Sequence, residues 1–196
     1  WDTVLSKLKS GDYVFIQFGH NDEKSAEKLH TVPGSTFDEN LRRFVRETRA
    51  KGAYPVLFNS IVRRNFPPEG ATENKGSYEM EGNTLVDTHG EYLESPRRVA
   101  KEMNVPFVDM NKLTHDLVVG MGVEKSRSLF MWVPAGKYDF CPKGKIDNTH
   151  LNGYGYRAQA HAVYEKGIEL GYWFANGGDV TSDGWIVVED DVIQAD

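Results

Sequence analysis

Residues 13–22 read YVFIQFGHND, and they carry the strongest indication of the fold class. The first six form a nearly continuous apolar run without polar–apolar alternation, which is typical of a strand buried on both faces of a parallel sheet. Gly19 ends the run, and His20, Asn21 and Asp22 follow it. Ligand sites of open parallel sheets lie at the C-terminal ends of strands, so these side chains are candidates for a functional site. An Asx turn that only bonds nearby backbone is the structural alternative.

Strands and helices are predicted to alternate around this stretch. Apolar spacing and flanking Gly and Pro residues predict strands at 13–18, 54–58 and 105–110 and helices at 1–10, 37–51, 90–103, 111–119 and 153–170. The helix at 37–51 carries a capping-box pattern in Thr36 and Glu39. Residues 63–86 are polar and rich in Gly, Pro and Asn, which predicts a long loop. Alternating strands and helices indicate an α/β fold with a parallel sheet and right-handed crossovers.

The composition is that of a globular chain and excludes several functional classes. With 196 residues, 39% hydrophobic and 27% charged, the chain is large enough for a core, and it is neither disordered nor collagen-like. The net charge is −6 and no block of basic residues occurs, which argues against a nucleic-acid or anionic-membrane partner. No apolar run is long enough to span a membrane, the first residues show no targeting segment, and the single Cys141 excludes an internal disulfide framework.

A second polar cluster precedes the last predicted helix, where residues 147–152 read DNTHLN. An Asp three residues before a His can accept a hydrogen bond from the imidazole Nδ1–H, which leaves Nε2 as a general base. Asp147 and His150 are therefore candidate catalytic residues. The structural alternative is a helix N-terminus, for which Asn152 is a plausible cap.

Taken together, the two clusters resemble the SGNH (GDSL-type) hydrolases, and among them the rhamnogalacturonan acetylesterase-like branch. The resemblance covers roughly residues 1–170 and rests on segments 16–22, 89–92, 98–102, 105–109 and 147–152. It implies a flavodoxin-like, three-layer α/β fold with a parallel sheet, here lacking the first two strands. In the flavodoxin-like strand order 2-1-3-4-5, the remaining strands stay contiguous. The strand at 13–18 then becomes an apolar edge that is bare, paired with a second chain through self-association, or paired with the tail at 185–188.

The resemblance also implies site residues and an activity. His150 would be the catalytic base, Asp147 its orienting carboxylate and Asn21 the side-chain donor of the oxyanion hole, while His20 and Asp22 hold their loop in shape. The reaction needs no cofactor. It would remove acetyl groups from an acetylated plant cell-wall polysaccharide, rhamnogalacturonan being the first candidate, in an extracellular or periplasmic location.

One element of the family pattern is missing from the sequence. The family carries its nucleophilic serine in a Gly-Asp-Ser turn and a second oxyanion donor on a glycine, and both precede the helix that opens this chain. Neither Gly-Asp-Ser nor Gly-x-Ser-x-Gly occurs in residues 1–196. We therefore expect residues 1–176 to form a partial SGNH hydrolase domain that is inactive by itself. Residues 177–196 would be a C-terminal tail, with strand propensity at 185–190, or the start of a following segment.

Two alternatives remain open at the level of sequence. His20, Asp22, Asp147 and His150 could bind a divalent metal whose bound water is the nucleophile, which would explain the missing serine. Alternatively, the chain is a catalytically dead relative that only binds carbohydrate.

Some charged and aromatic residues could contact substrate. Arg63 and Arg64 could bind galacturonate carboxylates or form a solvated surface pair. Trp132, Tyr138 and Phe140 could stack on sugar rings or pack beneath a long loop.

Overall fold

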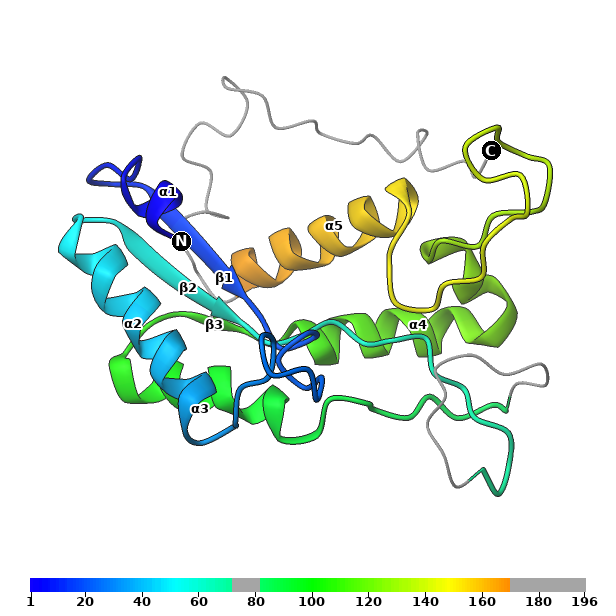
Figure 1. Ribbon diagram of the computed structural model, residues 1–196, viewed down its shortest axis with the longest axis horizontal. Helices are drawn as coiled ribbons and strands as arrows, with labels where there is room; N and C mark the ends of the chain where they lie inside the picture. The colour runs from blue at the N-terminus through cyan, green and yellow to red at the C-terminus, as the bar shows by residue number, and fades with distance from the viewer. Residues whose placement is uncertain (72–81, 170–196) are drawn as a thin grey trace. The chain divides into compact units, whose positions relative to one another are not determined.

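The computed structural model describes residues 1–71 and 82–169 (Figure 1). They form two compact units: unit 1 comprises Trp1–Ile61 and His89–Asn111, and unit 2 comprises the described residues of 62–88 and 112–169. The expected tail at 177–196, with its strand propensity at 185–190, lies outside the described residues, and the boundary expected at residue 176 stays a prediction.

Unit 1 is built on a parallel three-stranded sheet with the order β1-β2-β3 (Figure 1). The strands are β1 (Tyr13–Gln17), β2 (Tyr54–Phe58) and β3 (Phe107–Val108). The α/β class and the contiguous order expected for the last strands of a flavodoxin-like sheet are confirmed. The third strand is shorter than predicted, and Pro106, which has no N–H to donate to a sheet ladder, lies just before it.

Two helices of unit 1 cover one face of this sheet: α2 (Thr36–Ala50) packs on β1 and β2, and α3 (Glu94–Met103) packs on β2 and β3 (Figure 1). The short helix η1 (Gly90–Leu93) leads into α3. Phe37, Leu41 and Val45 recur every four residues, so they share the buried face of α2. They form a core with these residues of the sheet, α3 and the turn after α3: Ile16, Leu57, Val99, Ala100 and Val105.

Strand β1 is not buried on both faces, and that expectation was wrong. Ile16 is 3% exposed in the core, whereas Phe15, on the opposite face, is 47% exposed. The physical reason is position, since β1 pairs only with β2 in the described part of the chain and is an edge strand. By contrast, the residues of the central strand β2 from Pro55 to Phe58 are all buried.

The predicted capping box at the start of α2 is also wrong. Ser35 is the N-cap residue and makes no side-chain capping hydrogen bond. The Thr36 hydroxyl instead accepts a hydrogen bond from the backbone N–H of Val32, and the Asp38 carboxylate accepts one from Gly34. The short polar side chains bind the incoming turn rather than the free N–H groups of the helix.

The remaining helices differ from the predictions mainly in length. The first, α1 (Asp2–Leu5), is a single turn, while α4 (Met110–Ser126) is longer than expected and breaks its helical geometry at Gly122, which has φ 76°. Helix η2 (Arg127–Leu129) follows, and α5 (Gly153–Glu169) ends the described chain. The predicted cap of α5 is confirmed, because the side-chain oxygen of Asn152 accepts a hydrogen bond from Gly155 at 2.9 Å.

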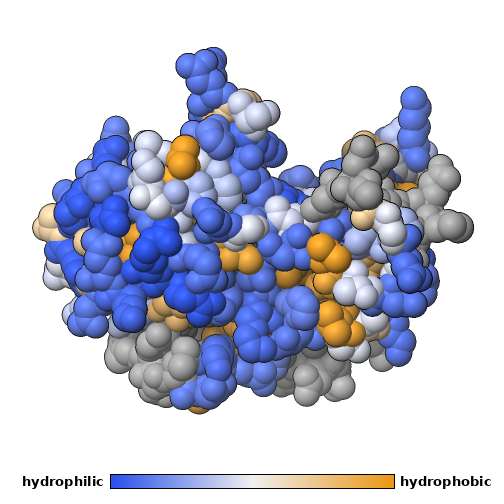
Figure 2. Space-filling view, turned by 90° about the horizontal axis from the view of Figure 1, so that it is seen from below, coloured by the Kyte–Doolittle hydropathy of each residue, from blue (hydrophilic) through white to orange (hydrophobic). Residues whose placement is uncertain are grey.

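Hydrophilic side chains cover most of the face in Figure 2, with hydrophobic residues in a few separate groups. Across the described residues, none of the helices combines the length and apolar character needed to cross a bilayer.

Candidate active site

Asp147 and His150 form the hydrogen bond that the sequence predicts. Asp147 Oδ2 lies 2.7 Å from His150 Nδ1, and Oδ1 accepts the backbone N–H groups of Thr149 and His150 at 2.9 and 2.8 Å. Lys145 Nζ also lies 2.7 Å from Oδ2. The carboxylate therefore receives four hydrogen-bond donors from a segment of six residues.

This arrangement fixes the ionisation of Asp147 and the tautomer of His150. Burial of the carboxyl disfavours its charged form, but the hydrogen bonds from Lys145 and from the two backbone N–H groups outweigh burial and hold the pKa of Asp147 well below its usual value. An ionised carboxylate only accepts hydrogen bonds, so Nδ1 of His150 carries a proton and Nε2 of the neutral ring holds the lone pair. The His150 side chain is 70% exposed, which leaves the ring open to a substrate.

A buried arginine holds the backbone beside this pair. The backbone N–H of Arg64 donates to the carbonyl of Asn148 at 2.8 Å, and its guanidinium donates to the Asn148 side-chain oxygen at 3.2 Å. Trp132 Nε1 donates to the same side-chain oxygen at 2.9 Å. Asn148 lies between Asp147 and His150 in sequence, so these bonds immobilise the turn that carries both catalytic candidates.

The expectations for Arg63 and Arg64 need correction. Arg64 is fully buried rather than part of a solvated pair, and it also donates to Ser126 Oγ at 3.1 Å and to the Val123 carbonyl at 2.6 Å. Arg63 is half-buried and donates to Thr88 at 2.8 Å. Arg64 is thus a structural residue of unit 2, and its place in the sequence gave no sign of this.

The aromatic residues of unit 2 divide into two kinds. The guanidinium of Arg64 lies 5.1 Å from the centre of the Trp132 ring, and Trp132 is half-buried. Tyr138 and Phe140 are 43% and 81% exposed, and their rings stack at 5.2 Å. Tyr138 and Phe140 thus present exposed ring surface that a sugar could cover, and the half-buried Trp132 lines a pocket of unit 2.

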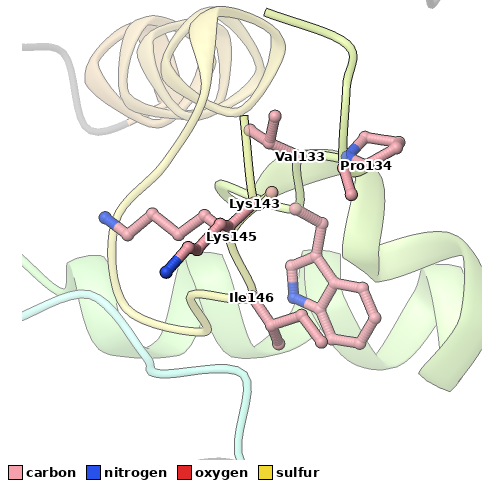
Figure 3. A pocket seen from close by; sticks show the side chains of 8 residues that line it. Val133, Pro134, Lys143, Lys145 and Ile146 are labelled. Atoms are coloured by element: carbon pink, nitrogen blue, oxygen red, sulfur yellow. The ribbon is translucent and has the colours of Figure 1, made fainter. Parts of the chain in front are cut away.

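A pocket of about 540 Å³ lies beside the Asp147 segment within unit 2 (Figure 3). Antiparallel hydrogen bonds of 2.8 Å between Val133 and Lys145 close the chain into a loop that borders it. Figure 3 shows the side chains of Lys143 and Lys145 extending in the same direction, away from Val133 and Pro134. Because Lys145 contacts Asp147, the pocket adjoins the catalytic candidates.

The turn that carries Asn21 belongs to unit 1. Gly19 has φ 133°, and a Cβ there would lie 2.4 Å from Ser60 Oγ, so only glycine fits this close approach. Asp22 holds the turn, since its carboxylate accepts hydrogen bonds from Gly19 N at 3.0 Å and Thr31 Oγ1 at 2.9 Å. Asn21 is exposed at the tip, and its side-chain amide makes no hydrogen bond within the described residues. That Asn21 and His150 face each other stays a prediction.

His89 is a supporting residue whose role the sequence does not indicate. It is 3% exposed, its Nδ1 lies 2.8 Å from Glu23 Oε2, and its Nε2 lies 2.9 Å from the Ile61 carbonyl. The carbonyl only accepts, so Nε2 carries a proton. His89 also meets the ring of His20 edge-on at 4.5 Å. These contacts brace the Asn21 turn against the residues that follow β2, and His20 takes part in them.

Asn59 ties together the C-terminal ends of the three strands. It is fully buried; its carbonyl accepts from Gln17 Nε2 at 3.0 Å and its side-chain amide donates to Asp109 Oδ1 at 2.8 Å. A single asparagine after a strand has no distinctive sequence signal, so only the contacts could identify it.

The metal-binding alternative combines His20 and Asp22 of unit 1 with Asp147 and His150 of unit 2, and it stays a prediction. Within residues 1–71 and 82–169, no group of three or more His, Cys, Asp or Glu side chains is placed to hold a metal ion. Both oxygens of Asp22 and both oxygens of Asp147 already accept hydrogen bonds from the protein.

Comparison with known proteins finds a family and several relatives. The profile of the GDSL-like Lipase/Acylhydrolase family matches residues 3–163. Rhamnogalacturonan acetylesterase RhgT of Bacillus subtilis (strain 168) is 36% identical over 168 residues, which are 86% of this chain and 66% of the relative. The probable rhamnogalacturonan acetylesterase YesY of the same organism is 26% identical over 170 residues, 86% and 67% of the two chains. The chain thus spans about two thirds of the length of these curated relatives.

Solved structures are similar in fold. The crystal structure of YxiM from Bacillus subtilis has a TM-score of 0.64 at 24% identity, covering 88% of this chain and 41% of that one. Axe2, an acetylxylan esterase from Geobacillus stearothermophilus, has a TM-score of 0.51 at 16% identity, covering 83% and 61%.

Proposed function

Because the chain belongs to the GDSL-like lipase and acylhydrolase family, we propose that it is part of a serine esterase that removes acetyl groups from a pectic polysaccharide. The observation that carries the proposal is the Asp147–His150 hydrogen bond of 2.7 Å, which leaves Nε2 of an exposed imidazole as a base. The family profile and the RhgT relative support the ester-hydrolase chemistry.

In the proposed reaction, His150 Nε2 takes the proton of a serine hydroxyl as the serine oxygen attacks the acetyl carbonyl. Asn21 donates its amide N–H to the oxyanion that forms. When the tetrahedral intermediate collapses, His150 returns the proton to the departing sugar hydroxyl and an acetyl-serine remains. Water, deprotonated by His150, then attacks the acetyl-serine; acetate is released as His150 returns that proton to the departing serine oxygen, which regenerates the serine. Asp147 stabilises the imidazolium without taking its proton.

The serine of this proposal lies outside residues 1–196, because no Gly-Asp-Ser turn occurs within them. We therefore expect residues 1–196 alone to show no turnover of acetyl esters. The catalytic experiments below use the protein with the serine-bearing segment included.

The substrate is proposed from the relatives' names, two of which are rhamnogalacturonan acetylesterases or probable ones. The exposed Tyr138 and Phe140 rings are compatible with a carbohydrate ligand, since sugars commonly stack on aromatic faces. An extracellular or periplasmic location belongs to the same proposal.

The test is turnover of an acetyl ester by matched histidine and asparagine variants. His150→Ala should lower kcat/KM by about 10⁴-fold, because the general base is lost. Asn21→Ala should lower it by about 10²–10³-fold, the usual cost of one oxyanion donor. His161→Ala is the control, since His161 is an exposed histidine on α5 that pairs with Glu165 at 3.2 Å. Full activity of either site variant would show that the residue does not have the proposed role.

The two alternatives give different results in the same assay. A metal-dependent hydrolase would lose activity to a chelator and regain it on addition of a divalent metal, whereas the serine mechanism predicts an unchanged rate. A dead carbohydrate-binding relative would bind pectic oligosaccharide without releasing acetate, even with the serine-bearing segment present.

A further inference from the structure

The Asp147 carboxylate binds a lysine ammonium as well as the histidine. Lys145 Nζ and His150 Nδ1 both lie 2.7 Å from the same oxygen, Oδ2. Among the described residues, Lys145 and His150 are the ones whose side chains contact this carboxylate. The proposed reaction leaves Lys145 without a role.

The backbone positions Lys145 for this contact. Its N–H and C=O exchange hydrogen bonds of 2.8 Å with Val133. The preceding Gly144 has φ 71°, and a Cβ there would lie 2.5 Å from the Val133 carbonyl, so the turn accepts only glycine. The Lys145 side chain is 46% exposed, whereas the Asp147 side chain is 12% exposed. The ammonium of Lys145, held by a turn with fixed backbone, thus contacts the mostly buried carboxylate of Asp147.

We propose that Lys145 is a positioning residue that weakens the hold of Asp147 on protonated His150 and so keeps His150 available as a base at lower pH. The inference rests on the proposed function of His150 and deepens it.

The charges of the three groups determine in which direction Lys145 changes the protonation of His150. Asp147 stabilises the imidazolium by attraction and by accepting its Nδ1–H. Lys145 donates a hydrogen bond to the same oxygen of Asp147. Its positive charge also repels the imidazolium. Since the pKa of Asp147 is held well below its usual value, the carboxylate stays ionised throughout the neutral range, and the pH response belongs to the imidazole. Removing the ammonium therefore favours the protonated, catalytically idle form of His150.

The experiment replaces Lys145 by Met, which keeps the length of the side chain but removes its charge. The pH at which His150 takes up its proton is followed by nitrogen-15 NMR, with the signal assigned through His150→Ala. In Lys145→Met the pH of this transition should rise by about 0.5–1 unit. The shift is small because the side chains of Lys145 and His150 are both partly exposed, so solvent screens their interaction. The acidic limb of the kcat/KM profile should move upward by the same amount, while kcat on the alkaline plateau changes little.

Two further variants separate charge from structure. Lys143→Met removes a neighbouring lysine that lines the same pocket and should leave the His150 transition unchanged. Lys145→Arg keeps the positive charge, so the pH of its His150 transition should stay close to that of the parent protein. An unchanged transition in Lys145→Met, an equal shift in Lys143→Met, or a Lys145→Arg transition as high as that of Lys145→Met would each overturn the inference.

The NMR readout does not depend on catalysis, so the two hypotheses fail separately. If the His150 transition moves while His150→Ala stays fully active, the proposed function is wrong and the coupling to Lys145 stands. If His150→Ala is inactive while the transition does not move, the function stands and the role of Lys145 is wrong.

Discussion

At the scale of single residues, the site depends on side chains that differ sharply in burial. His150 is exposed, as its proposed role as a base requires, whereas Arg64 is fully buried and holds the turn around Asn148. A buried guanidinium is tolerated because its N–H groups meet oxygen acceptors and its faces meet the aromatic rings of Phe66 and Trp132.

Arg64→Met tests this role. The substitution leaves buried acceptors of Asn148 and Val123 short of a donor, so the free energy of unfolding should fall by about 2–4 kcal/mol. Urea denaturation gives the value. Arg63→Met, at the adjacent half-buried arginine, should cost clearly less, and equal losses for both variants would contradict the argument from burial.

At the scale of elements, a buried carboxylate joins helices α2 and α3. Asp38 is 0% exposed, and both oxygens of its carboxylate accept hydrogen bonds, one from Gly34 at 2.8 Å and the other from Arg98 at 2.7–2.8 Å. Burial by itself favours the neutral acid, but the hydrogen bonds from Ser95, Gly34 and Arg98 outweigh it and hold the pKa of Asp38 below its usual value.

The pH dependence of stability follows from that direction. A folded-state pKa below the unfolded value of 3.8 means that Asp38 stabilises the fold above that pH. The stabilisation is lost as the pH falls through the folded-state pKa. In urea denaturation, Asp38→Asn should therefore be less stable than the parent at pH 7, and the difference should shrink at pH 3 and below. Asp2→Asn, at an exposed carboxylate, is the control. A constant difference between parent and Asp38→Asn at all pH values would refute the linkage.

At the scale of the whole molecule, the sheet of unit 1 has an exposed edge strand. β1 pairs only with β2 among the described residues, and Phe15 and Phe18 at its exit are 47% and 48% exposed. Natural proteins usually shield such edges with charge or with another element, because unpaired backbone groups can pair with a second chain.

We expect residues 1–196 to self-associate through β1. Phe15→Lys places a charge on the edge and should shift the chain toward monomer in size-exclusion chromatography with light scattering. Phe140→Lys changes an equally apolar but more exposed residue on a loop and should leave the association in place. If the parent chain is monomeric, or if both variants dissociate it equally, pairing through β1 is wrong.

The amino-acid sequence alone determined the features that depend on residues close together in the chain. The α/β class, the position of β2, the Asn152 cap and the Asp147–His150 hydrogen bond were all predicted correctly, because spacing along the chain places these groups within reach of one another. The family match confirms the resemblance seen in the two polar clusters.

Long-range packing set the features that the sequence did not reveal. The burial of Arg64 depends on Asn148, which lies 84 residues away. His89 gains its role from Glu23 and Ile61, and Lys145 reaches Asp147 because its backbone pairs with Val133. Such contacts bring together residues distant in the chain, and their energies depend on burial and on satisfied hydrogen bonds, which exist only once the chain has folded.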